Sequence, residues 1–199
     1  PEGRDETQWK KWLDDQDRRL DKQEQVKWAY WTRYRRRFES GLASILQRNG
    51  EDETRAQQAA EEAGDALHTS TSLALRRIIN PDQEGPWLCK GLVMGNVQSG
   101  KTGHYAGLIN KAVDCGYRLI IILAGMTNDL RQQTQRRIDS DLRGRSTERN
   151  STEILGVGRV DIGEDLPQPI SWTTADKNGD LRGTVATYIQ NVADLTGKA

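Results

Sequence analysis

The sequence has few of the residues that bind metals or form disulfides. It contains two cysteines and two histidines among 199 residues. His68 and His104 are the only histidines, so no cluster of imidazoles can hold a metal ion. Cys89 and Cys115 lie in apolar stretches, where reduced thiols fit better than a disulfide. We therefore expect neither a His/Cys metal centre nor a disulfide-stabilised extracellular domain.

Long apolar runs and an excess of one charge are also missing. The longest apolar run, residues 119–124, is too short to cross a membrane. The N-terminal residues lack the apolar segment of a signal peptide. Because 29 basic residues balance 29 acidic ones, no net charge draws the chain to nucleic acid or lipid. We expect a cytoplasmic protein with no membrane partner.

Two motifs that DNA-processing enzymes use are missing as well. Restriction nucleases need an acid two positions before a lysine, and none of the lysines here has one. ATP hydrolysis needs an acidic residue at the end of a second apolar strand, and no such run follows Ala124. The mean hydropathy of the chain, −0.81, is lower than expected for a protein that covers both faces of a parallel sheet. We expect no nuclease activity of this chain's own and weak or no turnover of any nucleotide that it binds, as in the first part of a longer enzyme.

One stretch fits a nucleotide-binding motif without a mismatch. Residues 95–102 match the phosphate-loop pattern G-x-x-x-x-G-K-[ST]. Its glycines allow backbone N–H groups to point at phosphate oxygens. The Lys101 ammonium suits the β- and γ-phosphates and the Thr102 hydroxyl suits Mg²⁺, so we expect ATP and Mg²⁺ as cofactors and these two residues in catalysis. The predicted nucleotide-binding residues are Gly95, Asn96, Val97, Gln98, Ser99, Gly100, Lys101 and Thr102, the last also being the metal ligand.

Apolar runs on both sides of this loop predict a parallel sheet. Residues 92–94 are typical of the end of a buried strand, and residues 118–125 include three consecutive isoleucines, as in a strand buried on both faces. Ala106, Ile109 and Val113 predict a helix between these strands. The predicted fold class is α/β: an incomplete RecA-like P-loop NTPase parallel sheet preceded by an α-helical N-terminal region. We place the helical region at residues 1–80 and the NTPase domain at residues 81–199, with weaker strands at 154–160 and 170–174.

The predicted helical region is rich in tryptophan. Apolar and aromatic residues recur at helical spacing up to Asn49-Gly50, a pair that stops the helix. Shorter helices are expected from Glu51 to about residue 66 and from residue 72 to 79. Four of the six tryptophans lie in the first helix and need a covering surface. That surface is either the rest of the same chain or a second copy, which would make a homo-oligomer.

Basic residues suggest two places where DNA could bind. Residues 27–37 interleave lysine and arginine with aromatic rings, which suits a nucleic-acid strand. The alternative is that the basic side chains pair with the acids of the preceding 24 residues or face solvent. After the second predicted strand we expect a helix with Thr127 or Asn128 as N-cap and Leu130, Thr134 and Ile138 on its inner face. A solvated helix face is the alternative interpretation of its arginines. The possible DNA-contacting residues of this segment are Thr127, Asn128, Arg131, Arg136 and Arg137.

Taken in order, these motifs resemble the Z-one domain family. The resemblance rests on GNVQSGKT, GLINKA, GYRLIIILAG and TNDLRQQTQ, and extends through GVGR and ISWTT to NGD, over roughly residues 85–190. The family comprises bacterial P-loop ATPases associated with restriction and phage-defence operons and with putative endonucleases. The order of parts is also similar to superfamily-two helicases. The resemblance implies a DNA-directed ATPase that works beside a partner nuclease, with residues 127–133 against a DNA backbone.

A second function class stays open at this point. The tryptophan-rich helix could make an oligomer whose assembly is gated by nucleotide at the phosphate loop, without motor activity on DNA. DNA-stimulated ATP turnover favours the first class, whereas nucleotide-dependent assembly that is indifferent to DNA favours the second.

Overall fold

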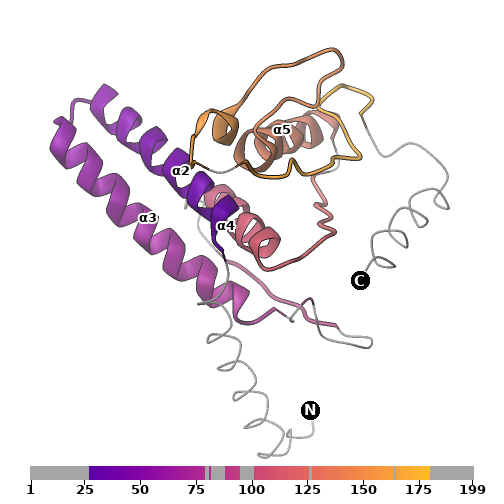
Figure 1. The fold of residues 1–199 in the computed structure, drawn as a ribbon, viewed down its shortest axis with the longest axis horizontal. Helices are drawn as coiled ribbons and strands as arrows, with labels where there is room; N and C mark the ends of the chain where they lie inside the picture. The colour runs from indigo at the N-terminus through magenta and orange to yellow at the C-terminus, as the bar shows by residue number, and fades with distance from the viewer. Residues whose placement is uncertain are drawn as a thin grey trace, which may run out of the picture.

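Helices dominate the part of the chain that the structure describes. This computed structural model describes residues 27–78, 81, 88–94, 101–125, 127–163 and 165–179. The α-helices in these ranges are α2 (Ala29–Arg48), α3 (Glu53–Leu75), α4 (Lys101–Asp114) and α5 (Asn128–Ile138). The π-helical turn η1 (Asp139–Arg143) continues α5, and the 3-10 turn η2 (Gly156–Arg159) follows. Helices α2 and α3 lie side by side, α4 packs against both, and α5, η1 and η2 form a neighbouring group (Figure 1). None of the described helices is long and apolar enough to span a membrane.

The turn between α2 and α3 lies where the sequence predicts it. Asn49 ends α2, and Gly50 has a φ of +99°, which favours glycine. Asp52 then caps α3, its side chain accepting a hydrogen bond from the Arg55 N–H at 3.1 Å. The predicted stop at Asn49-Gly50 is confirmed.

Helix α3 runs without a break through the residues predicted to separate two shorter helices. It spans 23 residues, so the predicted helix start near residue 72 is wrong. The hydroxyl groups expected to cap a new helix instead bond backwards within α3: Thr69 Oγ1 donates to the Asp65 carbonyl at 3.0 Å and Thr71 Oγ1 to the Leu67 carbonyl at 2.7 Å. Bonding to the preceding turn lets threonine sit inside a helix.

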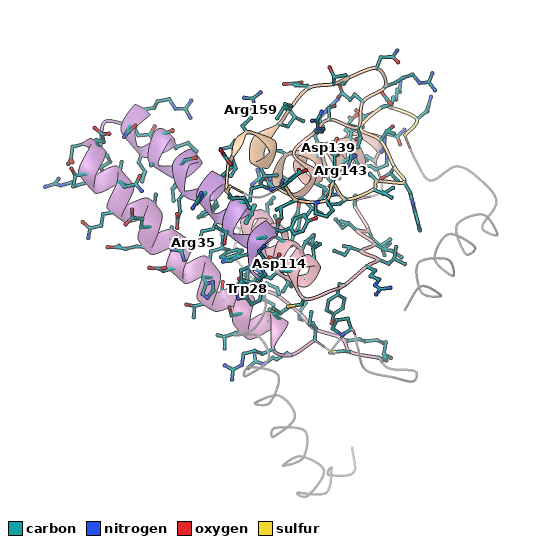
Figure 2. All side chains as sticks on the ribbon, viewed as in Figure 1. Trp28, Arg35, Asp114, Asp139, Arg143 and Arg159 are labelled. Atoms are coloured by element: carbon teal, nitrogen blue, oxygen red, sulfur yellow. The ribbon has the colours of Figure 1, made fainter. Side chains whose placement is uncertain are left out.

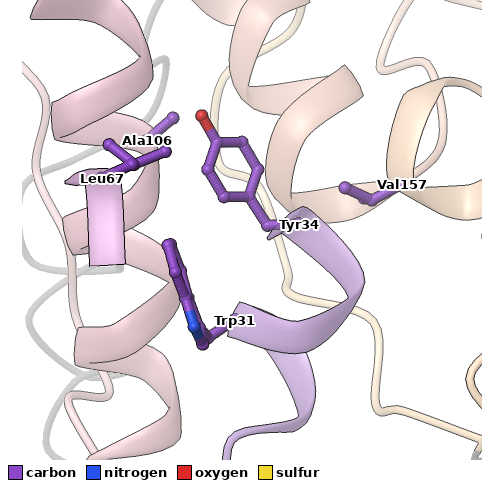
Figure 3. Packing of buried hydrophobic residues seen from close by; sticks show 5 residues of the cluster. All are labelled: Trp31, Tyr34, Leu67, Ala106 and Val157. Carbon is purple, nitrogen blue, oxygen red and sulfur yellow. The ribbon is translucent and has the colours of Figure 1, made fainter. Parts of the chain in front are cut away.

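Aromatic side chains of α2 form the centre of the core. Trp31 and Tyr34 are buried to 3% and 1% exposure, against Leu67 of α3, Ala106 of α4 and Val157 of η2 (Figure 3). Their ring centroids are 6.0 Å apart in a tilted arrangement, which aromatic pairs favour. Thus these two rings are covered by the chain's own helices. Trp28, another tryptophan of the predicted first helix, is partly buried and packs against this cluster, whereas Trp9 and Trp12 lie outside the described residues.

The predicted α/β fold with a RecA-like parallel sheet is wrong. Residues 88–94 and 117–125 form no strand, and the only β-pairing within the described residues is an isolated bridge between Arg145 and Ile154. Leu92 is 83% exposed and Leu123 is 91% exposed, so neither run is buried on two faces. An apolar run becomes a strand only when a neighbouring strand completes its hydrogen bonds, and the described part of the chain supplies no such neighbour.

The two weaker predicted strands are also wrong. Residues 156–159 form η2, with Gly156 at a φ of +42°, and residues 170–174 are irregular. Gly158 explains the departure from strand geometry, because a Cβ there would lie 2.0 Å from the Gly144 carbonyl oxygen. The close approach of η1 and η2 therefore needs glycine at both positions. The boundary at residues 80 and 81 stays a prediction.

Candidate functional site

The candidate nucleotide-binding residues lead into the first turn of α4. Lys101 and Thr102 are the first two residues of this 14-residue helix, and both are exposed. The other six predicted residues of the loop, Gly95 to Gly100, lie outside the described residues. A helix start presents unpaired N–H groups and the positive end of the helix dipole, which favour a phosphate. The predicted helix directly after the loop is confirmed, whereas the predicted strand before it is not.

The first turns of α4 are held close to α2 by glycine. The Tyr34 hydroxyl donates to the Gly103 carbonyl at 3.0 Å, and burial raises the pKa of Tyr34. One turn later, a Cβ on Gly107 would lie 3.1 Å from Trp31 Cζ3 and 3.3 Å from Thr71 Cγ2. Lys101 and Thr102 therefore begin a helix whose position is fixed by the aromatic core.

The other end of α4 caps α2. The Asp114 carboxylate accepts hydrogen bonds from the backbone N–H of Tyr30 at 3.0 Å and of Trp31 at 2.8 Å. Trp28, at the N-cap position of α2, makes no side-chain capping bond. Asp114, far along the chain, therefore accepts the hydrogen bonds that an N-cap side chain would otherwise accept. Burial raises the pKa of Asp114, and the bonds from Trp31 and Tyr30 oppose that rise.

A buried lysine lies on α4 between these two ends (Figure 2 labels the neighbouring Trp28 and Asp114). Lys111 is fully buried; its ammonium donates to the His68 carbonyl at 2.8 Å and the Ser72 hydroxyl at 2.6 Å, both on α3. The ammonium also lies 4.4 Å from the Trp31 ring centroid, within cation–π range. Burial lowers the pKa of Lys111 to about 8. Lys111 joins three helices and is a structural group rather than a phosphate ligand.

Sequence reasoning missed Lys111, although the spacing held a signal. Of the predicted inner residues of α4, Ala106 is buried and Ile109 and Val113 are half-buried. Lys111 lies one helical turn after Gly107, which packs against Trp31 of α2. Residues four apart share a helix face. Gly103, Gly107 and Lys111 follow this spacing, which indicates a face where another helix can approach closely and where the lysine side chain is covered.

Helix α5 begins as predicted but buries a different face. Thr127 is its N-cap, accepting a hydrogen bond from the Leu130 N–H at 3.3 Å. The predicted inner face is wrong for Leu130, which is 47% exposed, whereas Thr134 and Ile138 are half-buried and the buried residue of α5 is Gln135. Gln135 donates at 3.0 Å to Asp139, a fully buried carboxylate whose other oxygen accepts from the Thr147 N–H at 2.8 Å. Polar pairing, not apolar contact, fixes this helix.

The three arginines predicted to contact DNA each bind within the chain. Arg131 donates to the Thr174 carbonyl at 2.8 Å and also to that of Asp176. Arg136 pairs with Glu148 at 3.0 Å, and Arg137 pairs with Asp141. A DNA phosphate would have to compete with these internal acceptors. Thr127 and Asn128 are exposed, and all five residues remain candidates for DNA contact.

The basic residues of α2 are also engaged internally. Arg35 pairs with Glu39 at 2.6 Å and with Asp65 at 2.7 Å. Arg36 donates to the Asp161 carbonyl at 3.0 Å. Arg35 therefore pairs with acids of α2 and α3, whereas pairing with the acids that precede this stretch stays a prediction, because residues 1–26 lie outside the described residues.

The donor set at the start of α4 fits a magnesium-bound polyphosphate in its chemistry. An ammonium and a hydroxyl at an exposed helix start match phosphate oxygens and a hard cation. No group of three His, Cys, Asp or Glu side chains that could hold a metal occurs among the described residues. Cys89 and Cys115 both remain thiols, and Cys89 is exposed rather than in the core.

No protein-family model, curated protein or solved structure matches this chain. The resemblance to the Z-one domain family therefore stays a prediction that rests on the motifs themselves.

Proposed function

We propose that this chain binds ATP with Mg²⁺ through residues 95–102. One observation carries the proposal: Lys101 and Thr102, the last residues of an unbroken phosphate-loop pattern, are the exposed first residues of α4. The Lys101 ammonium neutralises phosphate charge, and the Thr102 hydroxyl binds the cation. The N–H groups of the first turn of α4 add donors that the helix itself leaves unpaired. ATP supplies the polyphosphate and the transferable phosphoryl group.

Within this proposal, the chain is the nucleotide-binding part of a cytoplasmic, DNA-directed ATPase that acts beside a partner nuclease. The support is the resemblance of its motifs to the Z-one domain family. The exposed N-cap of α5, Thr127, follows residues 117–125 at the place that the resemblance assigns to DNA. Because Arg131, Arg136 and Arg137 already have acceptors within the chain, we expect DNA binding to be weak and strongly dependent on salt.

A nucleotide-gated assembly module is the second candidate function. Large apolar side chains next to the loop favour it: Met94 is 85% exposed, and Ile121 and Leu123 in residues 117–125 are also exposed. Contact with another polypeptide would remove this apolar surface from water. Molecular mass with and without ATP distinguishes the two functions, together with phosphate release with and without DNA. DNA-stimulated release selects the ATPase, and ATP-dependent assembly without a DNA effect selects the module.

Isothermal titration with Mg-ATP tests the binding step. We expect the wild-type chain to bind and Lys101→Ala to weaken binding at least about tenfold, since charge-assisted bonds to phosphate contribute about 1.5–3 kcal/mol each. Lys177→Ala is the matched control, because it removes an exposed lysine from a turn outside the site. Equal affinities for wild type and Lys101→Ala would refute the proposed site.

A further inference from the structure

A second cationic site lies away from the phosphate loop. A groove of about 710 Å³ is lined by four arginines from three parts of the chain, Arg33 of α2, Arg143 and Arg145 at the end of η1, and Arg159 of η2. We call it the arginine groove. Figure 2 shows Arg143 and Arg159 in the part of the molecule formed by α5, η1 and η2. Among the described residues, two carboxylates, Asp161 and Asp165, also line it, so four arginines and two acids give these lining residues an excess of positive charge.

The two half-buried arginines, Arg33 and Arg143, which we call the inner arginines, are held in place by backbone carbonyl groups. Arg33 donates from Nη2 to the Leu142 carbonyl at 2.8 Å, and Arg143 donates from Nε to the Pro169 carbonyl at 2.9 Å. Each guanidinium carries five N–H donors, so one such bond leaves most of them unused. The backbone carbonyls fix the geometry and carry no net charge, although the Asp139 carboxylate, 3.8 Å from Arg143, offsets part of the charge of that side chain.

Neither inner guanidinium has its donors fully satisfied by the described residues. Arg33 Nε and Arg143 Nη1 are buried without a hydrogen-bond acceptor in this part of the chain. Arg143 Nη1 lies 3.8 Å from Asp139 Oδ1, beyond hydrogen-bond distance. Burial also lowers the pKa of Arg33, which shows that its charge is unfavourably desolvated there. An anion in the groove would offset both costs.

The outer arginines, Arg145 and Arg159, are exposed. Among the described residues, the Arg145 side chain has no ion-pair partner. Arg159 donates from Nε to the Ile154 carbonyl at 2.9 Å and lies 3.7 Å from Glu153, which leaves other N–H donors of its guanidinium for a ligand. Of the two acids, Asp161 already accepts a hydrogen bond from the Gly163 N–H at 2.7 Å, which occupies one of its oxygens. The backbones of Gly144 and Gly158 are in direct contact, and both residues line the groove next to Arg145 and Arg159. This contact fixes the backbone from which the two arginine side chains extend.

We propose that the arginine groove binds a small phosphate-bearing anion. Planar guanidinium groups suit the paired oxygens of a phosphate, and the volume falls within the usual range for small-molecule sites, about 300–1,000 Å³. The side chain of Arg143 is only 15% exposed, which favours a compact ligand that enters the groove over a nucleic-acid duplex lying on its rim. This proposal is independent of nucleotide binding at Lys101.

Isothermal titration with pyrophosphate tests it, performed on Lys101→Ala so that the phosphate loop does not contribute. We expect binding that the double variant Arg145→Gln/Arg159→Gln weakens at least about tenfold. Both residues are exposed, so the fold should persist, which circular dichroism checks. Arg48→Gln/Arg55→Gln is the matched control: it removes the same two charges from exposed positions on α2 and α3, outside the groove, and should leave the affinity unchanged.

Three results would overturn the proposal. One is the absence of pyrophosphate binding by Lys101→Ala. Another is equal weakening by Arg48→Gln/Arg55→Gln and by Arg145→Gln/Arg159→Gln, which would indicate a general effect of net charge. The third is binding of a single-stranded oligonucleotide, lost in Arg145→Gln/Arg159→Gln, without any binding of pyrophosphate, which would make the groove a nucleic-acid surface.

Discussion

Two neighbouring parts of this molecule are held together by different chemistry. In the first, formed by α2, α3 and α4, the rings of Trp31 and Tyr34 pack against Ala106 and Gly107. In the second, formed by α5, η1, η2 and the residues up to 179, the centre is the buried carboxylate of Asp139. Apolar contacts tolerate small changes of shape, whereas a buried carboxylate needs each of its partners. The second part should therefore be more sensitive to the loss of one side chain.

The two parts meet through polar contacts as well as through the core. Asn110 of α4 donates from Nδ2 to the Asp141 carbonyl at 2.9 Å, and Arg33 of α2 donates to the Leu142 carbonyl at 2.8 Å. Val157 of η2 is fully buried in the aromatic cluster. Removing the hydrogen bonds of Asp139 should therefore also destabilise α4, the helix that begins with Lys101.

The largest expected effect comes from Asp139→Ala. The substitution removes the acceptor for Gln135 and Thr147 and leaves those groups and the nearby Arg143 without their partner. Breaking a buried ionic pair costs about 3–5 kcal/mol, and we expect a loss in the free energy of unfolding of that order. Urea denaturation followed by circular dichroism measures it. Asp129→Asn, on the exposed first turn of α5, should cost only a few tenths of a kcal/mol.

A loss below about 1 kcal/mol for Asp139→Ala would contradict the view that this carboxylate centres the second part.

The next effect concerns Lys111, a polar group within the aromatic part. Its pKa is about 8 in the folded chain, against an ordinary value of 10.5. Between these values the unfolded chain binds more protons, so the free energy of unfolding rises with pH across this window. The rise attributable to Lys111 is at most about 3 kcal/mol. Urea denaturation from about pH 7 to about pH 10 should show a smaller rise for Lys111→Met than for wild type.

Lys90→Met serves as the control for Lys111, because Lys90 is exposed. It should leave the pH dependence of wild type unchanged. Parallel curves for Lys111→Met and wild type would show that the Lys111 amine keeps its ordinary pKa.

A smaller effect tests the packing of α4 on α2. Gly107→Ala places a methyl group against Trp31, Thr71 and Tyr34, all fully or almost fully buried, so none can move aside. The cost of overpacking should exceed the gain from the higher helix propensity of alanine, so the free energy of unfolding should fall by about 1 kcal/mol. In Gly41→Ala the nearest atom is the flexible Arg37 guanidinium, so the same gain should stabilise by about 0.5–1 kcal/mol. Thermal denaturation of the pair should show shifts of opposite sign.

Sequence reasoning succeeded where the signal is local. The stop at Asn49-Gly50 and the Thr127 cap each depend on a few adjacent residues, and both are confirmed. Strands depend on a distant partner, and the apolar residues 118–125 find none within the described residues. Periodicity assigned the apolar residues of α5 to its inner face, whereas the buried residues are Gln135 and the following Asp139. Hydrophobicity cannot predict a polar group that is buried because its partners come from elsewhere in the chain.

The smallest effect concerns a surface ion pair of the second part. Arg136 and Glu148 are 57% and 43% exposed at a distance of 3.0 Å, and such pairs contribute at most about 1 kcal/mol. Arg136→Gln should change the free energy of unfolding by less than about 0.5 kcal/mol. It therefore tests DNA contact without disturbing the fold: a reduced salt dependence of DNA binding would assign Arg136 to the interface, and unchanged binding would remove it.

The most direct test of the account is hydrogen–deuterium exchange of α4 with and without Mg-ATP. If the phosphate loop binds nucleotide, the amides at the start of α4, around Lys101 and Thr102, exchange more slowly with Mg-ATP in wild type, and this protection is lost in Lys101→Ala. Identical exchange in the first turn of α4 with and without saturating Mg-ATP would contradict nucleotide binding at this helix.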